Sequence, residues 1–356
     1  MRILLVEPNK SKKYHTPYPP LALLKLATYH RQKRNKIKFV QGFSDNGFDP
    51  NIIYITSLFT YAYEPVHDVI RYYSKRYKKA RIVVGGIYAT LCSDHLRDIF
   101  KERIEIHKGL IQEVEDVLPD YSLFPEWRAS ILFSSRGCIR RCPFCSVPIL
   151  EPKFEAKKSI KHLIYPGHRK AIFWDNNILA SPFLGQILDE LEESNLEVDF
   201  NQGLDARLLN EEIGNRLMRF KMPLLRFAYD SNSIKSPLKK AINLLKDLGV
   251  RGRKIIIYCL YNHLDSPEDF LNRIKDILEW GAVVYPMRYE PLKPMPKNSY
   301  VSPNWTAEQL EMVAKARRVI GYGGAFPPYE GIKKKFFDAK SFEEAFELRP
   351  FPQSVK

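Results

Sequence analysis

The chain lacks any apolar run that approaches the length of a membrane-spanning helix, so we expect no membrane association. Its amino-terminal stretch, residues 1–8, is too short and too soon interrupted to resemble a secretory signal peptide. Only 5 cysteines occur among 356 residues, and they form no even, spaced framework. Such a sparse set argues against a disulfide-bonded secreted domain and indicates a reducing cytoplasm.

Acidic residues are also comparatively few, because 41 Asp and Glu face 56 Lys and Arg and give a formal net charge of +15. Much of the excess lies in local runs at residues 31–36, 71–81, 153–170 and 333–335. Tyrosines within the second run, Tyr72, Tyr73 and Tyr77, would suit stacking on bases. RNA is therefore one expected partner, and a solvated basic face is the alternative interpretation.

The first third of the chain alternates strand-like and helical patterns. Apolar runs at residues 2–6, 37–40, 52–55 and 81–86 predict buried strands. A stripe that begins at Leu21 predicts one helix, and residues 64–77 predict another. Strands that alternate with helices indicate a small, Rossmann-like parallel α/β domain.

A second series of strand-like runs begins after a proline-containing linker near residues 118–128. The runs lie near residues 131–136, 170–177, 197–203, 224–231, 253–263 and 282–289. Good N-caps precede the helices between them, at Ser181, Asn210, Ser236 and Ser266. Thr306 and Gln309 form a capping-box pattern, which predicts a last helix that ends near Gly321.

Three of the cysteines, Cys138, Cys142 and Cys145, are spaced C-x3-C-x2-C directly after an apolar run at residues 131–133. Thiolates so close together favour zinc or an iron–sulfur cluster. A structural zinc site needs a fourth protein ligand, but Cys92 and Cys259 are remote and solitary. A cubane cluster with one open iron fits better, and a zinc knuckle or three buried cysteines are the alternatives.

This motif resembles the signature of the radical S-adenosylmethionine (SAM) superfamily, in which an aromatic residue such as Phe144 usually precedes the last cysteine. The resemblance implies a partial (β/α)6 barrel that binds a 4Fe-4S cluster. It also implies that the open iron is chelated by SAM, and that one-electron reduction cleaves SAM to methionine and a 5′-deoxyadenosyl radical. The electron would come from a reductant of the flavodoxin or ferredoxin type.

The same resemblance implies cofactor-binding residues at the carboxyl ends of the strands. Asp175 and Asn176 follow the second strand of the series and would receive the methionine ammonium group. Gln202 and Arg207 follow the third, where the guanidinium would pair with the methionine carboxylate. Asp230 follows the fourth and would take ribose hydroxyls or the ammonium group. A helix cap or a hydrogen bond inside the barrel is the alternative for each of them.

The first domain resembles the amino-terminal module of the cobalamin-binding branch of this superfamily, through Gly85, Gly86 and the Pro-Pro-Leu at residues 19–21. The D-x-H-x-x-G motif of that branch is missing, because residues 7–10 read Glu-Pro-Asn-Lys. We therefore expect no tight cobalamin binding. Either Tyr88 or Phe59 would fill the cleft at the strand ends.

These expectations define three domains, at residues 1–125, 126–295 and 296–356: a Rossmann-like domain, the partial barrel and a helical, basic extension. The predicted protein is a radical SAM enzyme that acts on an unassigned substrate, with no catalytic residue assigned beyond the cofactor ligands. A cobalamin-dependent radical SAM methyltransferase is one alternative. A non-catalytic iron–sulfur or nucleic-acid-binding protein is the other.

Overall fold

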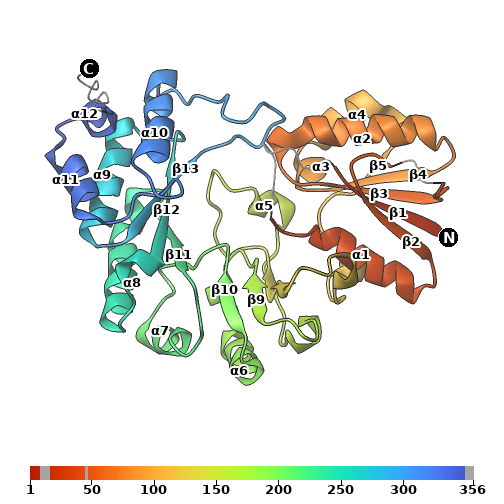
Figure 1. Ribbon diagram of the computed structural model, residues 1–356, viewed down its shortest axis with the longest axis horizontal. Coiled ribbons are helices and arrows are strands. Elements are labelled where there is room, and N and C mark those ends of the chain that lie inside the picture. The colour runs from red at the N-terminus through yellow and green to blue at the C-terminus, as the bar shows by residue number, and fades with distance from the viewer. Residues whose placement is uncertain (9–16, 45–46, 349–356) are drawn as a thin grey trace, which may run out of the picture. The chain divides into compact units, whose positions relative to one another are not determined.

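The computed structural model describes residues 1–8, 17–44 and 47–348, and the chain divides into two compact units (Figure 1). Unit 1 comprises Met1–Asn176, Ser181–Leu196 and Pro291–Ser299. Unit 2 comprises Asn177–Ala180, Glu197–Glu290 and Tyr300–Lys356. The predicted boundary near residue 125 falls inside unit 1. Within the described residues, no helix is both long and apolar enough to cross a membrane.

Unit 1 contains a five-stranded parallel sheet in the order β2-β1-β3-β4-β5. Its strands are β1 (Arg2–Glu7), β2 (Lys36–Gln41), β3 (Ile52–Ser57), β4 (Arg81–Gly86) and β5 (Glu105–Ile106). Strand β1 buries every side chain after Arg2, and β4 buries Ile82, Val83 and Val84, because helices cover both faces of the sheet; these stretches therefore read as continuous apolar runs. The predicted parallel α/β architecture of this part of the chain is confirmed.

Helices pack on both faces of this sheet. The helices are α1 (Leu21–Gln32), α2 (Tyr63–Arg76), α3 (Ile87–Leu91) and α4 (Ser93–Phe100). Figure 1 shows α1 on one face of the sheet and α2 with α4 on the other. Val66, Val69, Ile70 and Tyr73 form the apolar stripe of α2, and all four are buried in the core on that side.

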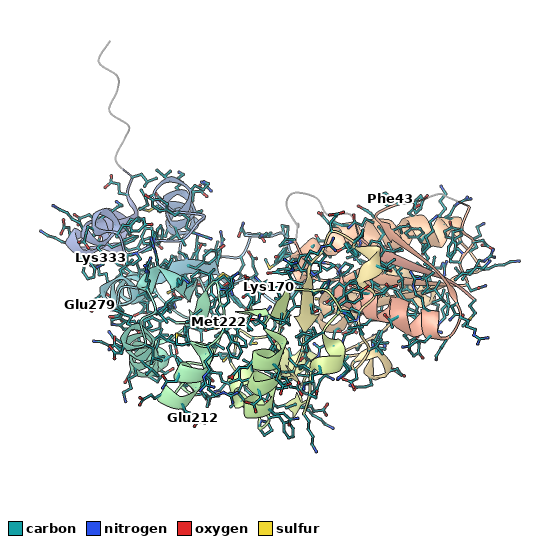
Figure 2. The ribbon with its side chains drawn as sticks, turned by 60° about the horizontal axis from the view of Figure 1, so that its bottom comes forward. Phe43, Lys170, Glu212, Met222, Glu279 and Lys333 are labelled. Atoms are coloured by element: carbon teal, nitrogen blue, oxygen red, sulfur yellow. The ribbon has the colours of Figure 1, made fainter. Side chains whose placement is uncertain are left out.

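The remainder of unit 1 carries the cysteine motif. Two strands pair in parallel, β6 (Ala129–Leu132) and β9 (Lys170–Phe173), and Lys170 is labelled in Figure 2. Between them, β7 (Ser135–Arg136) and β8 (Glu155–Ala156) pair antiparallel and bracket the helix α5 (Val147–Leu150). A longer helix, α6 (Leu184–Ser194), follows β9.

Unit 2 contains a parallel sheet in the order β11-β12-β13. The elements of this unit, in chain order, are β10 (Glu197–Phe200), α7 (Glu211–Leu217), β11 (Leu225–Ala228), α8 (Lys235–Asp247), β12 (Ile255–Tyr261), α9 (Pro267–Glu279), β13 (Val283–Arg288), α10 (Ala307–Val319), α11 (Glu330–Asp338) and α12 (Phe342–Phe346). Strand β10 is not part of the β11-β12-β13 sheet. All six strands predicted from residue 131 onward are present across the two units. The protein is thus a mixed α/β protein with parallel sheets.

The helix starts after residue 180 confirm three of the five predicted caps. Asn210 accepts the amide of Ile213, and both Ser266 and Thr306 form complete capping boxes. The cap predicted at Ser236 is wrong, because a 3-10 turn over Asn232–Ile234 leads directly into α8 and places Ser236 inside its first turn. The start predicted at Ser181 is early, since α6 begins at Leu184.

We predict that Ser266→Ala lowers the free energy of unfolding by about 1 kcal/mol, because the Asp269 amide at the start of α9 loses its acceptor, the Ser266 hydroxyl. Ser236→Ala is the matched control and should change it by less than about 0.5 kcal/mol, because Ser236 is exposed and caps nothing. Urea unfolding followed by circular dichroism measures both. Equal losses of unfolding free energy in the two variants would contradict the capping role assigned to Ser266.

A polar group of three side chains lies inside the apolar core of unit 1. His67 Nε2 lies 2.8 Å from the Tyr88 hydroxyl, which lies 2.7 Å from His95 Nδ1. His67 and Tyr88 are both buried. Burial, reinforced by the nearby His95 and Arg71, lowers the pKa of His67 to about 4. His67 is therefore neutral in the folded protein at neutral pH.

This shift predicts a loss of stability in mild acid. As the pH falls below the ordinary value of 6.5, an unfolded chain protonates His67, whereas the folded protein does not do so until about pH 4. The free energy of unfolding should therefore fall across that window. In His67→Gln the fall should be shallower, because this group no longer titrates. Urea unfolding at several pH values measures the slopes, and parallel slopes for parent and His67→Gln would refute the prediction.

Candidate functional site

The cysteine loop begins at Gly137, directly after β7. Gly137 has a φ of +72°, in the left-handed region that favours glycine. A Cβ atom at this position would lie 2.0 Å from the carbonyl oxygen of Lys153. The backbone at the start of the loop therefore lies against the segment that follows α5. Only glycine fits there.

Asp175 anchors the strand end that leads into the loop. Its buried carboxylate accepts bonds from the Ser134 amide (3.1 Å) and hydroxyl (2.6 Å), and from the Ser135 amide (2.5 Å) and hydroxyl (2.7 Å). Burial raises the pKa of Asp175, and these four hydrogen bonds act in the opposite direction. The structure gives Asp175 an anchoring role, and its predicted contact with the methionine ammonium group stays a prediction.

Glu151, which the sequence analysis missed, joins the two ends of the loop. Its carboxylate accepts the Gly137 amide at 2.6 Å, Arg136 Nη1 at 3.1 Å and Asn176 Nδ2 at 3.1 Å. Asn176, a predicted cofactor ligand, is therefore held beside the loop through its amide nitrogen. The sequence gives no local signal for this role, because Glu151 lies 14 residues after Gly137 in no recognised spacing.

Arg136 extends this arrangement toward the amino-terminal sheet of the same unit. Its guanidinium bonds both carboxylate oxygens of Glu115, at 2.7 and 3.0 Å, and lies 3.4 Å from the centre of the Phe133 ring. Glu115 offers its backbone carbonyl to the buried Lys25 of α1 at 2.8 Å. Bidentate and stacked contacts of this kind fix a guanidinium in one orientation. The loop is thus tied to α1 through a chain of polar contacts.

The three motif cysteines lie in this loop as partly exposed thiols. The amide of Arg140 points at Cys138 Sγ (3.3 Å), and that of Val147 points at Cys145 Sγ (3.4 Å). Amide donors to sulfur suit thiolate ligands of iron–sulfur clusters. Phe144 lies between Cys142 and Cys145 in the same loop and is also partly exposed.

The donor set fits a soft metal centre by its chemistry, but the thiols are not gathered around one point. Within residues 1–8, 17–44 and 47–348, no three His, Cys, Asp or Glu side chains are placed together so as to hold a metal ion. Ligation by Cys138, Cys142 and Cys145 therefore stays a prediction. It requires the loop to bring its three sulfur atoms together.

Unit 2 holds the other predicted cofactor residues. Arg207 is exposed and bonds Asp205 through Nε (2.7 Å) and Nη2 (3.2 Å). Asp205 also accepts Nδ2 of the buried Asn177 at 3.1 Å, so the guanidinium is held by an anchored carboxylate. Asp205 and Asn177 were missed by the sequence analysis. Gln202 is exposed and only 3.5 Å from the side chain of its neighbour Asn201.

Asp230 follows β11 and is largely buried. Burial raises its pKa to about 6, against the opposing influence of Arg273, the Leu260 amide and Arg207. Arg273 itself is buried and donates to the carbonyls of Tyr229 (2.8 Å) and Leu260 (2.7 Å). Asp230 is therefore a carboxyl group poised to change charge near neutral pH.

The predicted site residues thus fall into two sets. Unit 1 brings together the cysteine loop with Phe144, Asp175 and Asn176. Unit 2 carries Gln202, Arg207 and Asp230, of which the last two interact electrostatically. Cys259 of unit 2 is buried, and burial raises its pKa to about 12, which keeps its thiol protonated.

The strand ends of the amino-terminal sheet are closely packed where the cobalamin cleft would lie. The Ser57 hydroxyl donates to the Gly85 carbonyl (2.8 Å) and accepts the Ala89 amide (3.0 Å). A Cβ atom on Gly86 would lie 2.1 Å from the Ser57 carbonyl oxygen, and Tyr88 is fully buried. The expectation that cobalamin does not bind tightly stays a prediction.

Each basic run contains at least one cation in an ion pair. The pairs are Arg31–Asp120, Arg71–Asp68, Arg81–Glu105, Lys157–Asp116, Lys161–Glu193 and Lys333–Glu330. Acidic neighbours therefore offset part of the charge that the sequence analysis assigned to RNA. Contact with RNA stays a prediction.

Comparison with solved structures finds a distant structural likeness. No family model matches the chain, and no curated protein matches it. Coproporphyrinogen III oxidase (HemN) from Escherichia coli, described as a radical SAM enzyme, matches with a TM-score of 0.38 and 13% sequence identity. The match covers 60% of this chain and 58% of HemN, which is less than two thirds of that protein's length.

We predict that Glu151→Gln loosens the cysteine loop and lowers the free energy of unfolding by roughly 1–3 kcal/mol, because Gly137 and Arg136 lose a charged acceptor. Glu155→Gln, on the exposed edge of the neighbouring strand β8, is the matched control and should have little effect. Urea unfolding measures the stability, and hydrogen exchange at the Gly137 amide measures the loop. An unchanged exchange rate in Glu151→Gln would contradict the role given to this carboxylate.

Proposed function

We propose that this protein is a radical SAM enzyme that acts on a substrate the site does not identify. The observation that supports the proposal is the C-x3-C-x2-C loop, which begins beyond the carboxyl end of a parallel strand and has backbone amides directed at two of its sulfur atoms. No second pair of cysteines lies near it in the sequence to complete a closed zinc site.

In this proposal Cys138, Cys142 and Cys145 hold a 4Fe-4S cluster. When bound, the cluster and SAM supply one-electron cleavage of SAM to a 5′-deoxyadenosyl radical, and the protein supplies binding and orientation. Gly137 and Glu151 hold the two ends of the loop together. Asp175 binds Ser134 and Ser135, the two serines that precede the cysteine loop. Phe144 lies within the loop and would contact the bound cofactor.

The polar groups of unit 2 would orient the methionine and ribose parts of SAM. Arg207 would pair with the methionine carboxylate, held in place by Asp205. Asp230 would accept hydroxyl or ammonium protons when it is ionised, above a pKa of about 6. Asn176 and Gln202 would supply amide contacts. Cofactor binding through Asp230 should therefore weaken as the pH falls below about 6.

The proposal includes a partial (β/α)6 barrel built from the six strands β6, β9, β10, β11, β12 and β13. It also includes a one-electron donor of the flavodoxin or ferredoxin type. The amino-terminal sheet is proposed to resemble a module of the cobalamin-binding type that does not bind a corrinoid tightly, because residues 7–10 offer no ligating histidine. The close approach of Gly86 to Ser57 at the strand ends supports this. RNA remains a proposed partner of the basic runs.

We predict that anaerobic reconstitution with iron and sulfide gives about four iron atoms per chain, as a cubane cluster requires. Cys142→Ala should lose most of this iron, whereas Cys92→Ala is the matched control and should keep it, because Cys92 is buried far from the loop in sequence. Iron analysis and visible absorption measure the loading. Stoichiometric zinc without iron–sulfur absorbance would refute the proposal.

The loaded protein, given SAM and a strong reductant, should slowly release 5′-deoxyadenosine even without substrate, and Cys142→Ala should release none. Liquid chromatography of the products measures this release. A fully loaded protein that never cleaves SAM would favour the alternative of a non-catalytic iron–sulfur protein. A stoichiometric corrinoid band after purification from cells given cobalamin would instead favour the methyltransferase alternative.

A further inference from the structure

A groove of about 480 Å³ lies on unit 2 near the amino ends of β11 and β12, and neither the cysteine loop nor the predicted cofactor residues take part in it. Its apolar lining comes from the segment that leads into β11 and from the segment after α8. The side chains of this lining are Met218, Phe220, Met222, Leu224, Leu248 and Val250. All six are partly exposed, and Met222 is labelled in Figure 2.

Three cations line the same groove: Arg251, Arg253 and Lys254, all of them exposed. No acidic residue lines the groove, and none of the three cations forms an ion pair with any residue that the structure describes. This contrasts with the basic runs noted above, each of which contains at least one cation paired with an acidic residue elsewhere in the chain. The groove thus combines an apolar floor with an uncompensated positive rim.

The backbone of the rim is firmly held. Gly252 lies so close to the neighbouring chain that a Cβ atom there would be 1.8 Å from the Gly281 carbonyl oxygen. The Lys254 amide donates to the Arg251 carbonyl (2.8 Å), and the Val250 amide donates to the Leu245 carbonyl (2.9 Å). The three cations are therefore presented on a fixed turn, so an incoming ligand would not have to order that backbone.

We propose that this groove docks an acidic amphipathic segment of a partner protein. Apolar side chains of the segment would fill the floor, where two methionines can adapt their shape to the occupant. Several carboxylates would face the three cations, which steers association and fixes register. The proposal does not depend on the radical SAM function, because Arg207 and Asp230 follow the opposite, carboxyl ends of their strands.

The charges and the lining favour a peptide over other amphiphilic anions. A fatty acid carries one carboxylate and would leave two of the three cations unmatched. Single-stranded RNA would find only one aromatic ring, Phe220, on which a base could stack, whereas binding of single strands usually uses several such rings. An acidic helix satisfies both the apolar floor and the set of cations.

The test uses the full chain labelled with ¹³C at its methionine methyl groups, which gives signals from 6 methionines. The probe is a short helical peptide with leucines at i, i+3, i+4 and i+7 and glutamates elsewhere. We expect saturable shifts of Met218 and Met222, while Met287, Met295 and Met312 stay unchanged. A peptide of the same composition with its leucines scattered should cause no such shifts. Absence of shifts with the patterned peptide would overturn the proposal.

Charge-reversal variants then test the rim. The triple change Arg251→Glu, Arg253→Glu and Lys254→Glu should weaken peptide binding at least about tenfold. The triple change Lys239→Glu, Lys240→Glu and Lys315→Glu alters the same net charge at exposed positions of α8 and α10, and should leave binding within about twofold. Equal weakening in both would overturn the proposal. Stronger shifts of Met218 and Met222 with oligouridylate or anionic vesicles than with the peptide would also overturn it.

Discussion

The cysteine loop depends on one partly buried contact, the bond from the Gly137 amide to the Glu151 carboxylate. That contact joins the residue before the first cysteine to the residue after α5, so the segment between them forms a closed loop. Because the same carboxylate also accepts Arg136 and Asn176, a change at this point would disturb both ends of the motif and a neighbouring predicted ligand. Charged acceptors in partly buried positions make such contacts strong and directional.

Three buried charged groups elsewhere in the protein, Asp175, Asp205 and Arg273, each bond more than one partner. Asp175 accepts four hydrogen bonds from two serines, and Asp205 accepts Arg207 and Asn177. Arg273 is buried among carbonyl acceptors and Asp265. Such groups cost free energy unless they are paired. The bonds to Asp175 and Asp205 therefore anchor Ser134, Ser135 and Arg207 at the strand ends through protein groups alone.

Local patterns predicted most of the secondary structure. The six later strands and the caps at Asn210, Ser266 and Thr306 were found because each depends on neighbouring residues: apolar runs, or a side chain that bonds an amide a few positions on. Ser236 shows where this reasoning fails. Its Ser-Pro pair has a good cap sequence, yet the preceding 3-10 turn starts the helix earlier, and propensity alone cannot weigh that competition.

The sequence by itself determined the cysteine motif, the excess of positive charge and the parallel α/β class, because spacing, composition and periodicity are local properties. The tertiary structure alone decided which side chains meet: Glu115 with Arg136 across 21 residues, Asp175 with Ser134 across 41, and His67 with Tyr88 across 21. It alone also placed Arg251 beside Met222 in one groove. Contacts between distant segments depend on how the helices and strands pack, and a single sequence carries no periodic or short-range signal for that packing.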